Sequence, residues 1–338
     1  VGRPVAVETG VAYFARKPFE MPDGEFVAQV SHESDCGILL DLHNIYCNER
    51  NGRIRMRDFL DQIPLDRVWE IHLAGGQEMD GYWLDSHSGE MPGDLAAFSR
   101  EVVQSLPNLG ALNFEIYDTF LERLPPEALD RTVDKLRDIW SVAGQSRSDA
   151  PPVSRDPKPR PNPEQDPVAW EEGATRAVWK AAPEEHPWPQ DASAIRLYAR
   201  LARSFRGSML VRAMPRSLRY LLLRDGAGID TLLGRFHNAQ DPRLFTPLEA
   251  QSFADYVLDQ GETDPWLLAL MDYDLAFLRI VREGRSRSVV FPGDPTPVFE
   301  ALAEARMPAD FPPPPEWEIE LLPDTFSVGD FTPSATGS

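Results

Sequence analysis

The chain has 338 residues with 34 basic and 54 acidic side chains, so its formal net charge at pH 7 is −20. A surface this acidic repels phosphate, which argues against nucleic acid and anionic membranes as partners. Cys36 and Cys47 are too few for a disulfide scaffold, and no stretch approaches the roughly 20 apolar residues of a membrane span. We therefore expect a cytoplasmic protein, and its length predicts about two domains.

A proline-rich stretch divides the chain. Seven prolines fall between residues 151 and 167, where each fixes φ and removes a backbone donor. We predict an extended linker over residues 145–168. A first domain then covers 1–144, a mainly helical second domain covers 169–325, and a disordered tail covers 326–338.

Strand and helix patterns alternate in the first domain. Buried-strand patterns cover 4–8, 37–41, 68–74 and 111–117, and helical patterns cover 25–34, 56–62, 94–106 and 127–140. Alternation at this spacing is typical of an α/β fold, with parallel strands joined by crossover helices.

The second part has a different pattern. Helical periodicity covers 195–205, 217–223, 231–236, 247–260 and 265–283, and short strand candidates cover 288–291 and 317–322. Thr246 precedes a proline and lies three residues before Glu249, which is the pattern of a helix N-cap. We expect a helical domain with a small β-containing extension.

Metal-capable side chains stand at or near the ends of all four expected strands: Glu8, Asp41, His72 and Glu115. In parallel α/β barrels the active site lies at the carboxyl ends of the strands, where the connecting loops converge. A single carboxylate at a strand end is more simply explained as a helix cap or as a partner of an arginine. Four such residues on four strands instead indicate a site.

Further polar groups follow the second and third strands. Asp85 and His87 are two residues apart, so in an extended segment they would share one face. Asn44 and His43 come just after Asp41. Imidazoles mixed with carboxylates and an amide favour iron, manganese or zinc over calcium.

Four segments carry a family resemblance: LLDLHNIYCNERNGR (39–53), PLDRVWEIHLAGG (64–76), GYWLDSHSG (81–89) and NFEIY (113–117). They resemble the multinuclear non-heme iron-dependent oxidases of the methanobactin-biosynthesis type, which are TIM-barrel enzymes related in fold to xylose isomerase. The resemblance covers about residues 1–142. It implies two or three iron ions and dioxygen, used to rework cysteines of a ribosomally synthesised precursor peptide.

The resemblance also implies roles for individual residues. Glu8 would bridge irons, and Asp41 would be a ligand or support one. The role of His43 stays open, because many members of the family have asparagine there. The further ligands would be Asn44, His72, Asp85, His87 and Glu115, and the residues closest to the chemistry would be Glu8, His72, Asp85 and His87.

The family's barrel has eight strands, whereas four are expected here. We therefore expect residues 1–144 to be the C-terminal half of a (β/α)8 TIM barrel, truncated at its N-terminal side. A shortened protein whose half-barrels pair as a dimer is the alternative.

The second part resembles the helical partner protein of these oxidases, through residues 232–258 and 265–278. A fusion of oxidase and partner is the expectation, and an unrelated helical domain is the alternative. Two other functions stay open for the first domain. One is a divalent-metal isomerase or hydrolase on the same barrel, and the other is a non-catalytic metal-binding protein.

Overall fold

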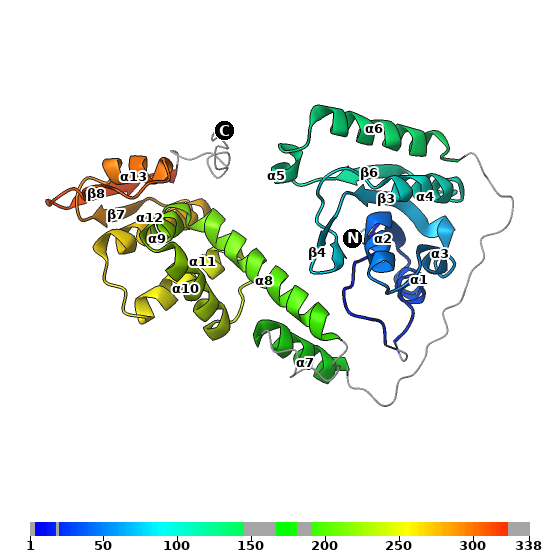
Figure 1. The fold of residues 1–338 in the computed structure, drawn as a ribbon, viewed down its shortest axis with the longest axis horizontal. Helices are drawn as coiled ribbons and strands as arrows, with labels where there is room; N and C mark the ends of the chain where they lie inside the picture. The colour runs from blue at the N-terminus through cyan, green and yellow to red at the C-terminus, as the bar shows by residue number, and fades with distance from the viewer. Residues whose placement is uncertain (1–3, 18–19, 145–166, 181–190, 324–338) are drawn as a thin grey trace. The chain divides into compact units, whose positions relative to one another are not determined.

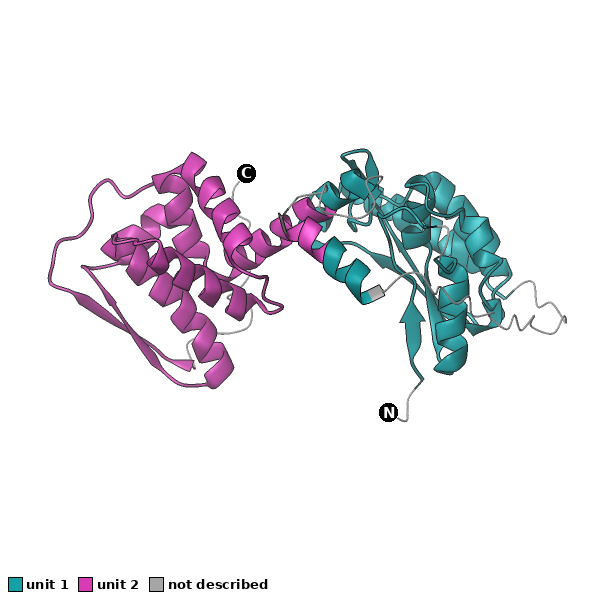
Figure 2. Cartoon of the chain, turned by 90° about the horizontal axis from the view of Figure 1, so that it is seen from below, with its two compact units in different colours: residues 1–174, 183–197 teal, residues 175–182, 198–338 magenta. Residues whose placement is uncertain are grey.

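The computed structural model describes residues 4–17, 20–144, 167–180 and 191–323 (Figure 1). The predicted tail lies outside the described residues, as does the predicted linker up to residue 166. The chain divides into two compact units (Figure 2). Unit 1 comprises residues 1–174 and 183–197, and unit 2 comprises residues 175–182 and 198–338.

Unit 1 is built on a four-stranded parallel sheet, as the alternating pattern predicts. Its strands neighbour one another in chain order: β1 (Ala6–Glu8), β2 (Gly37–Asp41), β3 (Val68–Ala74) and β6 (Ala111–Glu115). The expected helices are also present as α1 (Asp23–Glu33), α3 (Met56–Leu60), α4 (Gly93–Gln104) and α6 (Pro126–Ser141). The α/β architecture with a parallel sheet is therefore confirmed for this unit.

The core of unit 1 forms between the sheet and these helices. Ile38 and Leu40 of β2 and Ile71 and Leu73 of β3 are fully buried, and they pack in one cluster with apolar side chains of the helices. Burial of aliphatic side chains stabilises the fold by about 1.5–3 kcal/mol each. These central strands read as nearly continuous apolar runs, as expected for parallel strands covered by helices.

Several elements of unit 1 are absent from the sequence-based prediction. They are α2 (Leu42–Arg50), the short helices η1 (Leu65–Arg67) and α5 (Asp118–Leu121), and the hairpin of β4 (Gln77–Met79) and β5 (Tyr82–Leu84). The hairpin turn consists of Asp80 and Gly81, both at positive φ. Asp-Gly is a strong signal for such a turn, so the hairpin could have been predicted.

Unit 2 is predominantly helical over its described residues. Its main helices are α8 (Ala192–Ala213), which begins in unit 1, α9 (Pro215–Arg224), α10 (Gly226–Ala239), α11 (Thr246–Asp259), α12 (Pro265–Glu283) and α13 (Thr296–Ala303). Strands β7 (Arg287–Phe291) and β8 (Trp317–Leu321) pair antiparallel. α7 (Pro167–Lys180) crosses the division between the units and, like α13, is absent from the prediction. None of the helices in the described ranges is long and apolar enough to cross a membrane.

The N-cap predicted at Thr246 is wrong. The helix already includes Thr246, the residue before it is Phe245, and no side chain caps this end. The Glu249 carboxylate is fully buried and accepts hydrogen bonds from Arg206 Nε at 2.6 Å and from the Arg243 amide at 2.9 Å. The carboxylate therefore bonds Arg206 and the Arg243 amide rather than the Thr246 amide that a capping box would use.

Gly37 at the start of β2 gives a test of this packing. A Cβ atom there would lie 2.2 Å from the Trp69 ring, so Gly37→Ala should destabilise unit 1 by about 1–3 kcal/mol through overpacking. The urea midpoint of its far-UV circular dichroism transition measures this. The matched control is Gly93→Ala, where the added Cβ meets open space. Equal midpoints for the two variants would contradict the packing of Trp69 over β2.

Candidate metal centre

The strand register brings polar side chains together at one end of the parallel sheet. β2 and β3 pair so that Asp41 lies opposite His72, and β3 and β6 pair so that Ala74 lies opposite Glu115. Glu8 ends the neighbouring strand β1. The carboxyl ends of these strands therefore present acidic and imidazole groups at one edge of the sheet.

Two groups of three side chains at this edge have the geometry to hold a metal ion. The first is Glu8, Asp41 and His72, and the second is Asp41, His87 and Glu115. In each group, one potential ligand atom per residue lies within 4.8 Å of the others. Asp41 belongs to both groups, so two ions bound here would share its carboxylate. Five of the predicted ligands thus converge.

Asp41 is placed by the start of α2. It precedes the helix, and its Oδ1 accepts a hydrogen bond from the Asn44 amide at 2.8 Å. Burial raises the pKa of Asp41 to about 7, and the charges of Asp85 and Glu8 add to the effect. The simple explanation as a helix cap is therefore correct for one oxygen. The carboxylate has a second oxygen, so capping and metal binding are compatible.

Two buried polar atoms at this edge have no hydrogen-bond partner among the residues that the structure describes. Asn44 Nδ2 donates to the Thr9 carbonyl at 3.1 Å, which fixes the amide, while Oδ1 is unsatisfied. His72 Nδ1 is also unsatisfied, and it lies 3.2 Å from Glu115 Oε1 and 3.8 Å from Glu8 Oε1. Buried polar atoms normally have a hydrogen-bond partner, and some that lack one are ligands of an ion or a water molecule. The donor set therefore fits a hard or borderline metal ion.

The second ring nitrogen of His72 is held by a residue absent from the prediction. His72 Nε2 lies 3.1 Å from Glu70 Oε1, and Asn113 Nδ2 donates to the same oxygen. Glu70 and His72 share a face of β3 because side chains alternate along a strand. A carboxylate on the far nitrogen is a common orienting partner of a metal-bound histidine. The Glu-x-His spacing was the signal that could have identified Glu70.

Asp85 and His87 lie close together after the β4–β5 hairpin. Asp85 Oδ1 lies 3.1 Å from His87 Nε2 and accepts a hydrogen bond from His43 Nδ1 at 2.9 Å. Burial alone would raise the pKa of Asp85, but the bonds from the two histidines hold it well below its usual range. The hydrogen bond between Asp85 and His87 raises the pKa of His87. Tyr117 stacks on the His87 ring with centroids 5.1 Å apart.

His43 is completely buried, and its contacts give it a role. Trp83 Nε1 lies 3.4 Å from His43 Nε2, and an indole nitrogen can only donate. The proton of a neutral His43 ring is therefore on Nδ1, where it faces Asp85. His43 thus orients Asp85, which is a role that an asparagine amide could also fill.

Neither cysteine fits a ligand role. Cys36 and Cys47 are free and buried. Burial raises the pKa of the Cys47 thiol well above its usual range, and the charges of Asp85 and Asp41 act in the same direction. Cys47 is therefore a small packing residue beside His43.

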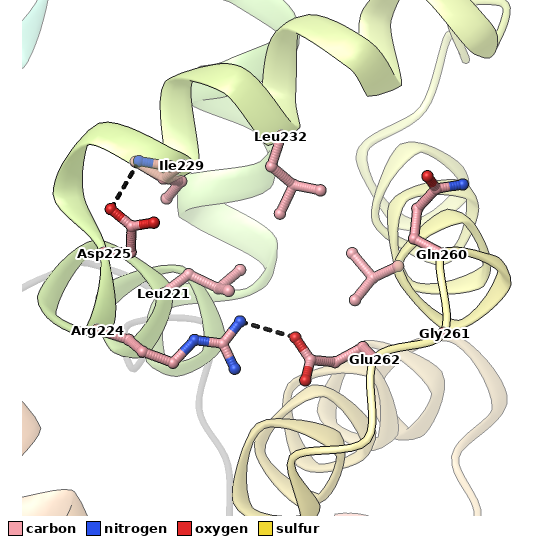
Figure 3. Close-up of a pocket in the computed structure, with 10 residues that line it drawn as sticks. Leu221, Arg224, Asp225, Ile229, Leu232, Gln260, Gly261 and Glu262 are labelled. Atoms are coloured by element: carbon pink, nitrogen blue, oxygen red, sulfur yellow. Dashed lines mark hydrogen bonds and ion pairs between the residues drawn. The ribbon is translucent and has the colours of Figure 1, made fainter.

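A pocket of about 330 Å³ lies in unit 2, between α9, α10 and the end of α11 (Figure 3). Its one cationic side chain, Arg224, is paired with Glu262 at 2.7 Å and with Asp264 at 3.2 Å. Both metal-capable groups found among the described residues lie instead in unit 1. The sheet edge is therefore the stronger candidate for chemistry.

Comparison with known proteins finds relatives that match part of this chain. An UPF0276 protein of Anaeromyxobacter sp. (strain Fw109-5) is 36% identical over 112 residues, which cover 33% of this chain and 40% of that protein. One from Chromobacterium violaceum is 35% identical over 106 residues, covering 31% of this chain and 38% of that protein. One from Neisseria meningitidis serogroup C is 34% identical over 152 residues, covering 43% of this chain and 51% of that protein. The chain thus spans about half or less of these relatives.

A family profile matches the residues that build the sheet. The matched range, residues 1–122, includes all seven predicted metal ligands. The family is described as RiPP precursor modification enzyme MbnB/TglH/ChrH, and residues 1–122 of this chain are similar to it.

Proposed function

We propose that this chain is the metal-binding part of an iron- and dioxygen-dependent oxidase that modifies cysteines of a ribosomally synthesised peptide in the cytoplasm. The observation that carries the proposal is the pair of metal-capable groups joined at Asp41, within the range that matches peptide-modifying enzymes. The four-stranded sheet would be the C-terminal half of a (β/α)8 barrel. Its strands follow one another in chain order and are all parallel, as in such a barrel.

The proposed ligands divide between two ions. Glu8, Asp41 and His72 would hold one, and Asp41, His87 and Glu115 would hold another. On this division Asp41 is the shared residue, whereas Glu8, for which the resemblance implies a bridging role, belongs to one group only. Asn44 and Asp85 would complete the set, and the unsatisfied Asn44 oxygen supports this role.

The chain's own residues prepare the centre for binding. Glu70 orients His72, and His43 orients Asp85. Glu8 ends the edge strand β1, and its side chain is 52% exposed. Bound iron would supply the one-electron chemistry that dioxygen requires, which zinc and magnesium cannot.

The proposed partners follow from the same family similarity. The substrate would be a precursor peptide that contains cysteine, and the helical second part would be a fused partner domain that helps present it. The carboxylate-rich set also suits magnesium or manganese, so a divalent-metal isomerase or hydrolase is the second candidate. A non-catalytic metal-binding protein is the third.

Metal analysis after anaerobic expression tests the proposal. We expect iron in excess of one ion per chain and, with dioxygen and a cysteine-containing precursor peptide from a neighbouring gene, a mass change on a cysteine. Zinc or magnesium alone, with no oxygen consumption, would favour the isomerase or hydrolase. Iron binding without peptide modification would favour the non-catalytic protein.

His72→Ala and His87→Ala should each reduce the bound iron and abolish oxygen consumption, because each removes one imidazole ligand. Far-UV circular dichroism should be unchanged, since neither side chain belongs to the apolar core. His32→Ala is the matched control, because His32 is an exposed residue of α1. Full iron content in both site variants would refute the ligand assignment.

Glu70→Ala should lower iron affinity about 10- to 100-fold, as is usual when the orienting partner of a ligand is lost. Glu70→Gln keeps an oxygen that can accept from His72 Nε2, so it should bind iron far better than the alanine variant. A competition titration with a chelator measures both affinities. If the two variants bind iron equally well, Glu70 does not orient His72.

Iron affinity should depend on pH near neutrality. The pKa of Asp41 is about 7 in the metal-free chain, so below that pH an ion must displace its proton. Affinity should then rise about tenfold per pH unit up to about pH 7 and flatten above it. The raised pKa of His87 acts in the same direction. Asp41→Asn should bind more weakly and with a shallower pH dependence, whereas an identical slope would exclude Asp41.

A further inference from the structure

The segment Thr9–Lys17, here called the 9–17 segment, leaves the candidate centre directly after Glu8. Its first residue is tied to that centre, because Thr9 Oγ1 accepts from the Asp41 amide at 2.9 Å. The Ala12 amide donates to Asn48 Oδ1 of α2 at 2.9 Å. The beginning of the segment is thus fixed by the same strand and helix that place Asp41.

The end of the segment is held from a distant part of the sequence. The Lys17 ammonium forms an ion pair with Asp191, and the two side chains are 2% and 1% exposed. Asp191 immediately precedes α8 and, like Lys17, belongs to unit 1. A buried charge that loses its partner is strongly unfavourable, so this pair holds the two segments together.

A second connection lies two residues further along. Ser193 Oγ and Tyr82 Oη form a 2.6 Å hydrogen bond. Tyr82 packs edge-on against Tyr13, with ring centroids 6.0 Å apart and planes at 89°. Tyr13 Oη in turn accepts a hydrogen bond from the Asp85 amide at 3.2 Å. A continuous series of contacts therefore leads from Ser193 to the backbone of a proposed ligand.

We propose that Asp191 and Ser193 are positioning residues: together they clamp the 9–17 segment, hold Tyr13 against the Asp85 backbone and so set the geometry of the candidate metal centre. As far as the metal is concerned, this inference rests on the proposed function. The part of the chain that follows the proline-rich stretch then supports the centre without supplying a ligand. After a proteolytic cut between residues 144 and 191, Asp191 and Ser193 (here called the clamp) would be joined to the 9–17 segment only by their non-covalent contacts.

Amide hydrogen exchange of the full, metal-free chain tests the clamp without any catalytic readout. Asp191→Ala should speed exchange at the Ala12 and Asp85 amides by about tenfold or more, because it frees local opening of the 9–17 segment. Ser193→Ala should speed exchange at Asp85 more than at Ala12. Titration with Fe(II) alone should show about tenfold weaker binding for Asp191→Ala, in the range typical of lost orienting partners.

Two further variants separate the clamp from general loss of folding. Lys17→Met combined with Asp191→Leu replaces the buried pair by apolar side chains and should restore slow exchange and iron binding. Asp138→Ala removes an exposed carboxylate paired with Arg100 and should change neither measurement. Unchanged exchange at Ala12 and Asp85 in Asp191→Ala would overturn the clamp. Failure of the unmodified chain to bind Fe(II) would instead overturn the proposed function, and the exchange data would still decide the clamp.

Discussion

Crowding of negative charge at one end of a parallel sheet is the constraint on which the rest of unit 1 depends. Parallel pairing of β2 with β3 places Asp41 opposite His72, and Glu115 and Glu8 end the strands on either side. Burial is the main cause of the raised pKa of Asp41, and repulsion from the nearby carboxylates adds to it. A bound cation reverses the sign of this interaction. A cation bound as proposed would therefore stabilise this edge of the sheet.

The surrounding residues fix the orientations of the crowded side chains through hydrogen bonds. Glu70 occupies the far nitrogen of His72, and His43 occupies an oxygen of Asp85. The contact with Glu70 leaves His72 Nδ1 near Glu8 and Glu115, and His43 shares Asp85 Oδ1 with His87. Orientation by hydrogen bonds before binding reduces the entropy that a metal ion must overcome, which is the general advantage of preorganised sites.

Much of unit 1 could be predicted from the sequence, because β2 is an apolar run and a metal-capable residue lies at or near the end of each strand. The convergence of Glu8, Asp41, His72 and Glu115 follows from the parallel arrangement alone. The helix α2 could not be predicted by apolar spacing, because its residues LHNIYCNER are buried on nearly every side whatever their polarity. Its start is instead set by Asp41, for which a helix cap was the simpler explanation and a metal ligand or its support was the favoured one.

The contacts between distant segments could not be predicted from the sequence, for a different reason. His43 meets Asp85 and Lys17 meets Asp191 through tertiary structure, and no local pattern encodes either pair. The Thr246 pattern failed in the same way, because the Glu249 carboxylate pairs with the distant Arg206 and with the Arg243 amide. Local signals thus predicted the elements, and long-range charge pairing decided several of the side-chain positions.

The backbone at His87 has a consequence for how this site can vary. His87 stands at φ 45°, in the left-handed region that most side chains avoid and that asparagine, aspartate and histidine tolerate best. Those three are also residues that can bind a metal. The loop conformation therefore favours glycine or one of these three residues at position 87, and all of these except glycine keep a ligand atom. An aliphatic residue at position 87 would lose the ligand atom and would also strain the backbone of the loop.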